Sequence, residues 1–320
     1  MSSSGVEVPT RSGVPPVAKE LAKSARKRSR VRSVGRDLWW LILPGAAVYL
    51  YVVVVPTVQG LQAAFTDWSF ATVGAPNFTG LENFTRIFNS DAGPAVFRTL
   101  QLAFVVVVGQ NVIGLALALL FNGRVFGRNV LRTIVFAPMV VSSLVVGYLF
   151  KYIFGPPGVG GVNQVLAALG QGPVDFLGNP TTAMVIIIVT ILWQSIGGNM
   201  VIYLAGLQGV PSELEEAAAL DGAGYWKRFW FVVRPLLAPA ITINLMLGLI
   251  GGLKIFDQIF ALTNGGPGNQ TQTIATLIYA YFSQYADYGR SAALALLLAV
   301  GIAILSIIQF SVLRRQERNS

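Results

Sequence analysis

The sequence predicts an all-α membrane protein with six transmembrane helices and with both termini in the cytoplasm. Three observations lead to this fold class. The chain is too apolar for a soluble domain, with 54% hydrophobic residues, 12% charged residues and a mean hydropathy of +0.63. It contains six apolar runs long enough to cross a bilayer, and its basic residues gather at alternate ends of those runs.

Each apolar run has roughly the 20 residues that a helix needs to cross the ~30 Å hydrocarbon core. Backbone groups in lipid must pair within their own segment, so each run is expected to be helical. Four runs are uncharged, whereas the third contains Lys151 and the fifth contains Lys254 and Asp257. The predicted spans are residues 38–59, 99–121, 133–154, 182–207, 238–262 and 291–313.

The basic residues determine the predicted orientation. With the N-terminus in the cytoplasm, the arm 1–36, the loop 124–132, the loop 227–234 and the tail 314–318 all lie inside, and they hold most of the 23 Lys and Arg. The opposite orientation would violate the positive-inside bias. The arm is rich in Ser, Pro, Val and charge without a periodic apolar face, so residues 1–36 are predicted to be disordered. We attribute the net charge of +9 to topology and to the lipid bilayer, not to nucleic-acid binding.

Several kinds of chemistry have no residues to support them. The chain has no cysteine and no histidine, which removes thiolates, disulfides and the commonest zinc ligand and proton shuttle. No Gly-x-x-x-x-Gly-Lys phosphate-binding loop occurs, so ATP hydrolysis by this chain is not expected. We therefore predict no catalytic residue, no metal site and no cofactor.

A charged stretch between the fourth and fifth spans is the most informative motif. Acidic residues crowd into 213–221, so this loop must face water, and its apolar residues then need a protein partner. Ser212 and Glu215 have the spacing of a capping box at a helix start. Gly222 follows where the chain must reverse, and a second short helix is predicted to end at Pro235.

The same residues resemble the signature of the permease subunits of bacterial ATP-driven (ABC-type) importers, which is Glu-Ala-Ala, three residues, Gly, nine residues, Ile, one residue, Leu-Pro. This chain has Val232 in place of Ile and Arg234 in place of Leu. The resemblance implies a cytoplasmic coupling loop at 211–235 that docks on the dimer of a separate ATPase subunit. It assigns that coupling to Glu216, Ala217, Ala218, Asp221 and Gly222.

Three further stretches resemble the sugar-importing branch, meaning the maltose, glycerol-phosphate and oligosaccharide permeases. They are 80–84 (Gly-Leu-Glu-Asn-Phe), Arg132-Thr133 with Pro138, and 262–268 (Leu-Thr-Asn-Gly-Gly-Pro-Gly). The resemblance implies the type I ABC importer permease fold over residues 37–320 in a bacterial inner (plasma) membrane. It also implies two further partners: a second homologous permease, and an extracytoplasmic sugar-binding lipoprotein or periplasmic protein.

A sugar pathway is expected where polar and small residues interrupt the fourth and fifth spans, because a translocated sugar needs hydrogen-bonding groups. Alignment with the maltose-type permeases supports several of these positions. The glycines among these positions have an equally good alternative explanation, which is that they let neighbouring helices approach closely. The predicted pathway residues are Trp193, Gln194, Ser195, Gly198, Asn199, Gly248, Gly252 and Ile255.

Other functions remain open at this point. An ion-coupled secondary transporter would place ionisable residues in the membrane, and Lys254 with Asp257 is the one candidate pair, at a spacing that also allows mutual neutralisation. A structural membrane protein without a pathway is a further alternative, although Gln194, Ser195 and Asn199 argue against it. An ABC importer permease for a solute other than a sugar is the remaining alternative.

Overall fold

The computed structural model describes residues 39–72, 74–88, 92–123 and 125–319, and the basic arm predicted over 1–36 lies outside this part of the chain. The described residues divide into two units, with the division between Gly60 and Leu61. The described residues are mostly helical, with an isolated β-bridge between Thr66 and Phe78. The helices are η1 (Trp39–Ile42), α2 (Leu43–Tyr49), η2 (Leu50–Val54), α3 (Val55–Ala63), α4 (Glu82–Phe88), α5 (Ala92–Asn122), α6 (Arg128–Val140), α7 (Ser143–Ile153), α8 (Gly161–Ala168), α9 (Pro180–Gln208), α10 (Ser212–Leu220), α11 (Tyr225–Arg228), η3 (Phe229–Val233), α12 (Arg234–Leu236), α13 (Ala238–Leu253), α14 (Asp257–Leu262), α15 (Ile274–Ser283) and α16 (Tyr288–Asn319).

The first apolar helix runs through α2, η2 and α3, over Trp40–Ala63. Its irregular turn, η2, is a π-turn in which the N–H of Val55 donates to the carbonyl of Leu50. Pro56 follows directly, and a proline ring disfavours the regular i→i−4 register just before it. Along this helix only Ala63 is buried in the described structure. The helix therefore accounts for the first predicted span.

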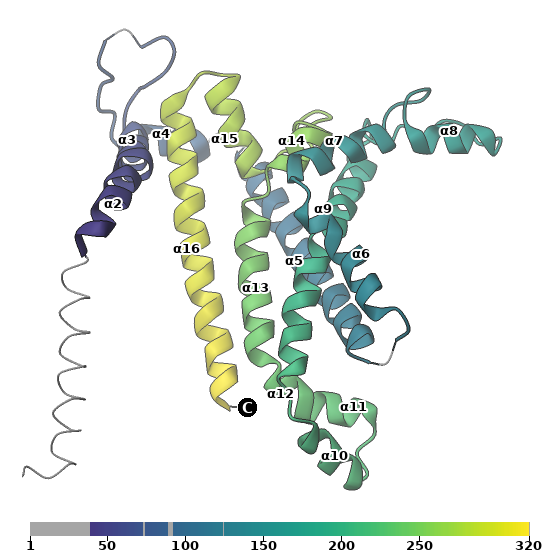
Figure 1. Cartoon of the computed structure of the whole chain (residues 1–320). Helices are drawn as coiled ribbons and strands as arrows, with labels where there is room; N and C mark the ends of the chain where they lie inside the picture. Colours follow the sequence, from purple (N-terminus) through teal and green to yellow (C-terminus); the bar gives the residue numbers. More distant parts are fainter. Residues whose placement is uncertain (1–38, 73, 89–91, 124, 320) are drawn as a thin grey trace, which may run out of the picture. The chain divides into compact units, whose positions relative to one another are not determined.

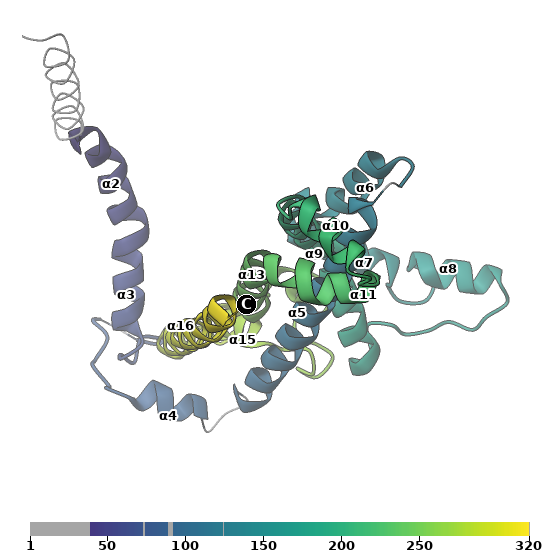
Figure 2. The ribbon, with the colours of Figure 1, turned by 90° about the horizontal axis from the view of Figure 1, so that it is seen from below.

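The second unit is built around α9, with α5 and α13 packed beside it (Figures 1 and 2). Gly114 on α5 lets α9 approach closely, since a Cβ there would lie 2.9 Å from the Cβ of Asn199. The same two helices share a buried hydrogen bond of 2.5 Å from the Tyr203 hydroxyl to Asn111 Oδ1. Small residues and polar bonds of this kind hold membrane helices together, because lipid tails provide no hydrophobic drive for association.

The third predicted span is not a single helix, which corrects the prediction for 133–154. It is broken into α6 and α7, which meet at 99°. Val141 and Ser142 at the break have extended backbone, with ψ of 140° and 135°. Such a break frees backbone carbonyls, and one of them, the carbonyl of Val141, accepts a hydrogen bond from Gln194 Nε2 at 2.8 Å. Hydropathy does not reveal the break, because both halves are apolar.

The fifth predicted span, 238–262, is also wrong as a single helix. Helix α13 ends at Leu253, and α14 begins only at Asp257. The axis of residues Tyr225–Leu236 is bent by 70° from that of α13. Lys254 and Asp257 are exposed, and they do not pair: the ion pairs in the described chain join Arg86 to Glu82 and Arg290 to Asp287. Six spans result among the described residues when each bent pair is counted as one.

The two helices that follow these breaks, α7 and α14, pack on each other. Gly147 on α7 faces α14, and a Cβ there would lie 2.6 Å from the Cβ of Ala261 and 3.3 Å from the Cα of Gln258. Ile259 and Leu262 of α14 are buried in the same apolar cluster as Val146 and Phe150 of α7. These contacts place α14 directly over the break in the third span.

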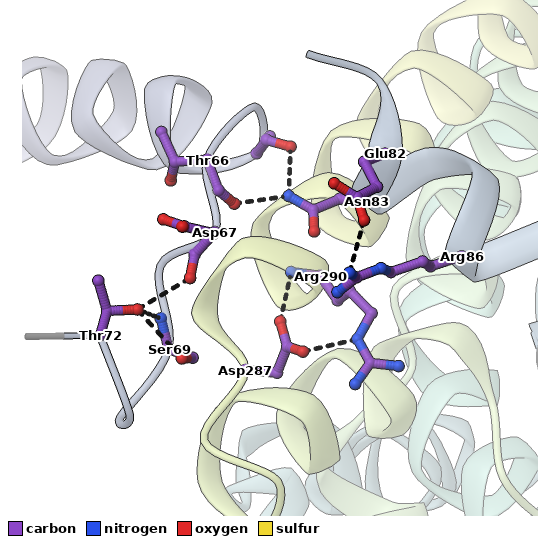
Figure 3. A network of polar contacts seen from close by, with 10 residues as sticks. Thr66, Asp67, Ser69, Thr72, Glu82, Asn83, Arg86, Asp287 and Arg290 are labelled. Carbon is purple, nitrogen blue, oxygen red and sulfur yellow. Dashed lines mark hydrogen bonds and ion pairs between the residues drawn. The ribbon is translucent and has the colours of Figure 1, made fainter. Parts of the chain in front are cut away.

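The stretch 80–84 has a structural role that Figure 3 shows. Asn83 at the start of α4 is 4% exposed, and its Nδ2 donates to the carbonyls of Ala64 (3.0 Å) and Thr66 (2.8 Å). Gly289 at the start of α16 must be small, because a Cβ would overlap the backbone carbonyl oxygen of Thr66 and lie 2.9 Å from Asn83 Nδ2. Nearby, hydrogen bonds from the Asn77 side chain and backbone hold the pKa of Asp67 below its usual value. This network fixes α4 against the end of α3 and the start of α16.

Gly172 and Gly224 test the predicted orientation. Gly172 lies between α8 and α9, and Gly224 is the N-cap of α11; α8 and α11 stand at opposite ends of the 29-residue helix α9, which spans about 43 Å (Figure 1). Neither has a positive φ, and a Cβ on either meets no atom within 4 Å. In this cysteine-free chain, we expect Gly172→Cys to react with an impermeant maleimide on intact cells and Gly224→Cys to react only after the cells are opened. Labelling in the reverse order would overturn the cytoplasmic placement of the termini.

Candidate functional sites

A cavity of about 340 Å³ lies where α5, α9 and α13 meet the breaks in the third and fifth spans. All of the predicted pathway residues except Trp193 line it. Residues that the sequence reasoning missed also line it, among them Gln110, Ser143, Asn244 and Gln258. The full lining is Val106, Gln110, Met139, Ser143, Ile191, Gln194, Ser195, Gly198, Asn199, Ile202, Asn244, Leu247, Gly248, Gly251, Gly252, Ile255 and Gln258.

Gln194 is the residue that joins the elements around this cavity. It is 7% exposed and stands in the middle of α9. Its Nε2 donates to the carbonyl of Val141, and its Oε1 accepts from Gln258 Nε2 at 2.8 Å. One amide therefore bridges the α6–α7 break and α14, because a glutamine has both donor and acceptor atoms.

A second group of amides lies further along α9. Asn199 Nδ2 donates to the carbonyl of Ser195 at 3.1 Å, and Asn244 Nδ2 of α13 donates to the carbonyl of Asn199 at 3.2 Å. The hydroxyl of Ser195 donates to the carbonyl of Leu192 at 3.5 Å. The cavity wall therefore carries several amides and hydroxyls within otherwise apolar helices. Polar residues inside membrane spans usually mark functional paths.

Two of the predicted glycines, Gly198 and Gly252, lie at helix contacts and also line the cavity. A Cβ on Gly252 would lie 3.1 Å from Ala103 Cα on α5, and one on Gly198 would lie 2.9 Å from Met139 Cε on α6. At Gly252 the α5 backbone would have to give way, whereas at Gly198 the flexible end of Met139 could move, so the close helix approach considered from the sequence fits Gly252 best. Both glycines also line the cavity, so the packing role and the pathway role are not exclusive.

Trp193 does not belong to this group. Its side chain is 42% exposed and packs against Phe150 of α7, with ring centroids 5.4 Å apart. Neighbouring residues on a helix point about 100° apart, so Gln194 can face the cavity while Trp193 does not.

The cavity residues that the sequence analysis missed could have been found from their side chains. Gln110, Asn244 and Gln258 are amides within or next to predicted spans, where polar side chains are rare.

The predicted coupling loop consists of α10, α11, η3 and α12. Helix α10 ends in a Schellman motif: the N–H of Ala223 donates to the carbonyl of Ala218 (2.9 Å), and that of Gly222 donates to Ala219 (3.1 Å). Gly222 has φ of +80°, which agrees with the expected chain reversal at a residue without a Cβ. Of the other predicted coupling residues, Glu216, Ala217 and Asp221 are exposed and Ala218 is half-buried.

Two details of this loop differ from expectation. Pro211 occupies the N-cap of α10 without a side-chain cap, so Ser212 lies within the first turn and the predicted capping box is not formed. The second helical segment does not end at Pro235 but continues to Leu236. Pro235 lies in the first turn of α12, where a proline's missing N–H is tolerated.

The loop is firmly attached to the membrane helices. Phe229 and Val233 of η3 are buried in one apolar cluster with Phe121 of α5 and Tyr203 of α9. Arg132 of α6 donates to the carbonyl of Phe121, which ties α6 to the C-terminal end of α5. The loop therefore packs against α5 and α9 through η3.

Comparison with known proteins gives consistent matches. Residues 110–318 match the family model described as "Binding-protein-dependent transport system inner membrane component". The chain is 36% identical to the multiple sugar-binding transport system permease protein MsmF of Streptococcus mutans, over 90% of this chain and 99% of that protein. It is 33% identical to the trehalose/maltose transport system permease protein MalF of Thermococcus litoralis, over 85% of this chain and 92% of that protein.

Solved structures show the same fold. A bacterial ABC transporter that imports the acidic polysaccharide alginate superposes with a TM-score of 0.76 at 27% identity, covering 90% of this chain and 99% of that chain. The alginate transporter in complex with its alginate pentasaccharide-bound periplasmic protein gives a TM-score of 0.75 at 26% identity, with 89% and 96% coverage.

Proposed function

The chain belongs to the family of binding-protein-dependent transport system inner membrane components, and from this membership we propose a permease subunit of an ATP-driven sugar importer in a bacterial inner membrane. It is a transport subunit and not an enzyme. It works with a second permease, an ATPase dimer and a binding protein outside the membrane. The single observation that supports the sugar is the full-length similarity to permeases named for sugars, MsmF and MalF among them.

The cavity is the proposed sugar pathway of this half of the transporter. Its amides offer hydrogen-bond donors and acceptors to sugar hydroxyls, and its apolar side chains contact the C–H faces of the ring. Gln194, Ser195 and Asn199 present such groups from α9, with Gly198, Gly248, Gly252 and Ile255 around them. A pathway must bind weakly enough to release its substrate, and neutral hydrogen bonds of this kind meet that need.

The loop 211–235 is the proposed coupling surface. Exposed Glu216 and Asp221 offer carboxylates to basic groups of the ATPase, while Ala217 and Ala218 allow close approach. The Schellman motif at Gly222 fixes the angle between α10 and α11. Because Phe229 and Val233 are embedded beside α5 and α9, a movement imposed on α10 is passed to the helices around the cavity.

Uptake into proteoliposomes tests the function. The complete transporter, with its second permease, ATPase and binding protein, is reconstituted with ATP inside, and uptake of maltose, trehalose and lactose is measured. We expect uptake of at least one sugar that requires both hydrolysable ATP and the binding protein, and that persists when ionophores collapse all ion gradients.

Two other outcomes would replace this proposal. Uptake that stops with the ionophores and continues without ATP would identify an ion-coupled secondary transporter. In the second outcome, the binding protein stimulates ATP hydrolysis only when it carries an amino acid or another non-sugar solute. That result would confirm an ATP-driven importer and reject a sugar as its substrate.

A further inference from the structure

We propose that Gln110 of α5 contacts the sugar and sets which sugars pass most readily. This proposal rests on the proposed function, and it adds a residue from a helix that the sequence reasoning did not include in the pathway. The claim concerns selectivity among sugars once they have been delivered, and not the first capture by the binding protein.

The burial of Gln110 without a partner is the first observation. The residue is 5% exposed and lines the cavity from the middle of α5. Within the described part of the chain its side-chain amide forms no hydrogen bond, although Asn111 next to it bonds both Val107 and Tyr203. Buried polar groups in proteins are nearly always paired. An amide that is inside the protein, unpaired and open to a cavity is therefore ready for a ligand.

The space made for this side chain is the second observation. Gly248 of α13 lies directly against Gln110, and a Cβ on Gly248 would overlap Gln110 Nε2. The next contact of such a Cβ, at 3.4 Å, is with Cγ2 of Val107 and would be ordinary. A Cβ on Gly248 would therefore displace the end of the Gln110 side chain and would not meet the α5 backbone, whereas a Cβ on Gly252 would lie against the backbone of Ala103.

The chemistry of the amide fits a sugar. A glutamine side chain offers two N–H donors and a carbonyl acceptor in one plane, so it can donate to one hydroxyl and accept from the next on the ring. Sites built to hydrogen-bond a hydroxyl discriminate strongly against ligands that lack it or place it elsewhere. Because Gln110 comes from α5, it approaches the sugar from a side that Gln194 and Ser195 of α9 do not cover.

Replacing the amide while keeping the shape tests the proposal. Gln110→Met is nearly isosteric, and Gln101→Met on the exposed part of the same helix is the matched control. With saturating binding protein, uptake of maltose and trehalose is compared, since the two disaccharides differ only in linkage. We expect Gln110→Met to lower uptake by about 3- to 10-fold, the value of one or two neutral hydrogen bonds, and to change the ratio of the two rates. A purely structural role would lower both rates by the same factor, and that result would overturn the proposal.

Gly248 supplies a second, independent test. Gly248→Ala should impair uptake because its methyl group displaces the Gln110 amide. In a Gln110→Ala background the overlap is gone, so Gly248→Ala should then have no further effect. Additive losses would show that Gly248 serves helix packing alone and would contradict the assigned contact.

The two proposals fail in different ways. If the wild-type transporter takes up no sugar under any of the conditions above, the proposed function is wrong. If the wild type imports a sugar and Gln110→Met matches it in rate and in maltose-to-trehalose ratio, only the role of Gln110 is overturned.

Discussion

Gly222→Val is expected to abolish transport while the protein still inserts into the membrane. The residue has φ of +80°, and a β-branched side chain reaches that conformation only at a cost of about 1–3 kcal/mol. No atom lies within 4 Å of a Cβ built there, so overlap of the Cβ does not contribute and backbone strain is the expected cause. If the strain is relieved by moving α10, docking on the ATPase weakens by roughly 5- to 150-fold. The measurements are membrane insertion, co-purification of the ATPase, and ATP-dependent uptake.

Two controls in the same loop separate strain from bulk. Gly224 is exposed, has φ of −66° and also has free space around it, so Gly224→Val should transport normally. Gly222→Asn should recover much of the activity, because asparagine tolerates the left-handed region better than other side chains. Normal uptake by Gly222→Val, or equal loss in both valine variants, would refute the role given to this turn.

Gln194→Leu is expected to cause the largest loss among the cavity variants. The substitution removes both hydrogen bonds at the break in the third span and leaves the carbonyl of Val141 and the amide of Gln258 without their partner. Buried groups left unpaired destabilise by about 1–3 kcal/mol, although single interhelical bonds in membranes average only about 0.6 kcal/mol. We expect a lower midpoint of thermal unfolding in detergent and at least a roughly tenfold loss of uptake, equivalent to 1.4 kcal/mol.

Graded variants locate the cause of this loss. Gln258→Leu removes only the bond between α9 and α14, so its effect should be smaller than that of Gln194→Leu. The double variant should be no worse than Gln194→Leu alone, because the shared bond is lost once. Gln208→Leu, at the exposed end of the same helix, should behave as wild type. If Gln258→Leu lowered uptake about tenfold and Gln194→Leu did not lower it, the hydrogen bonds of Gln194 would not be what stabilises the break in the third span.

The sequence by itself determined the class of the protein, the presence of apolar segments long enough to cross a membrane and the turn of the loop. Apolar length and charge asymmetry are properties of local composition, and these decide membrane insertion without reference to tertiary contacts. The turn at Gly222 was likewise predictable, since a left-handed conformation is a property of one residue and its neighbours. Several cavity residues of α9, and Gly248 and Gly252 of α13, were found for a similar reason, because polar residues and glycines stand out within an apolar run.

Only the tertiary structure decided where the spans break and which polar residues meet. At the break at Val141–Ser142, Gln194 of α9 satisfies the carbonyl of Val141, and no local pattern records a partner 53 residues away. After Leu253, the hydroxyl of Thr273 donates to the carbonyl of Ile255, again from a separate helix end. For the same reason, the local sequence does not show that Ser195 lines the cavity while Trp193 does not, or that Gln110 lies against Gly248. The direction of a helix face is fixed by packing, and packing depends on every helix together.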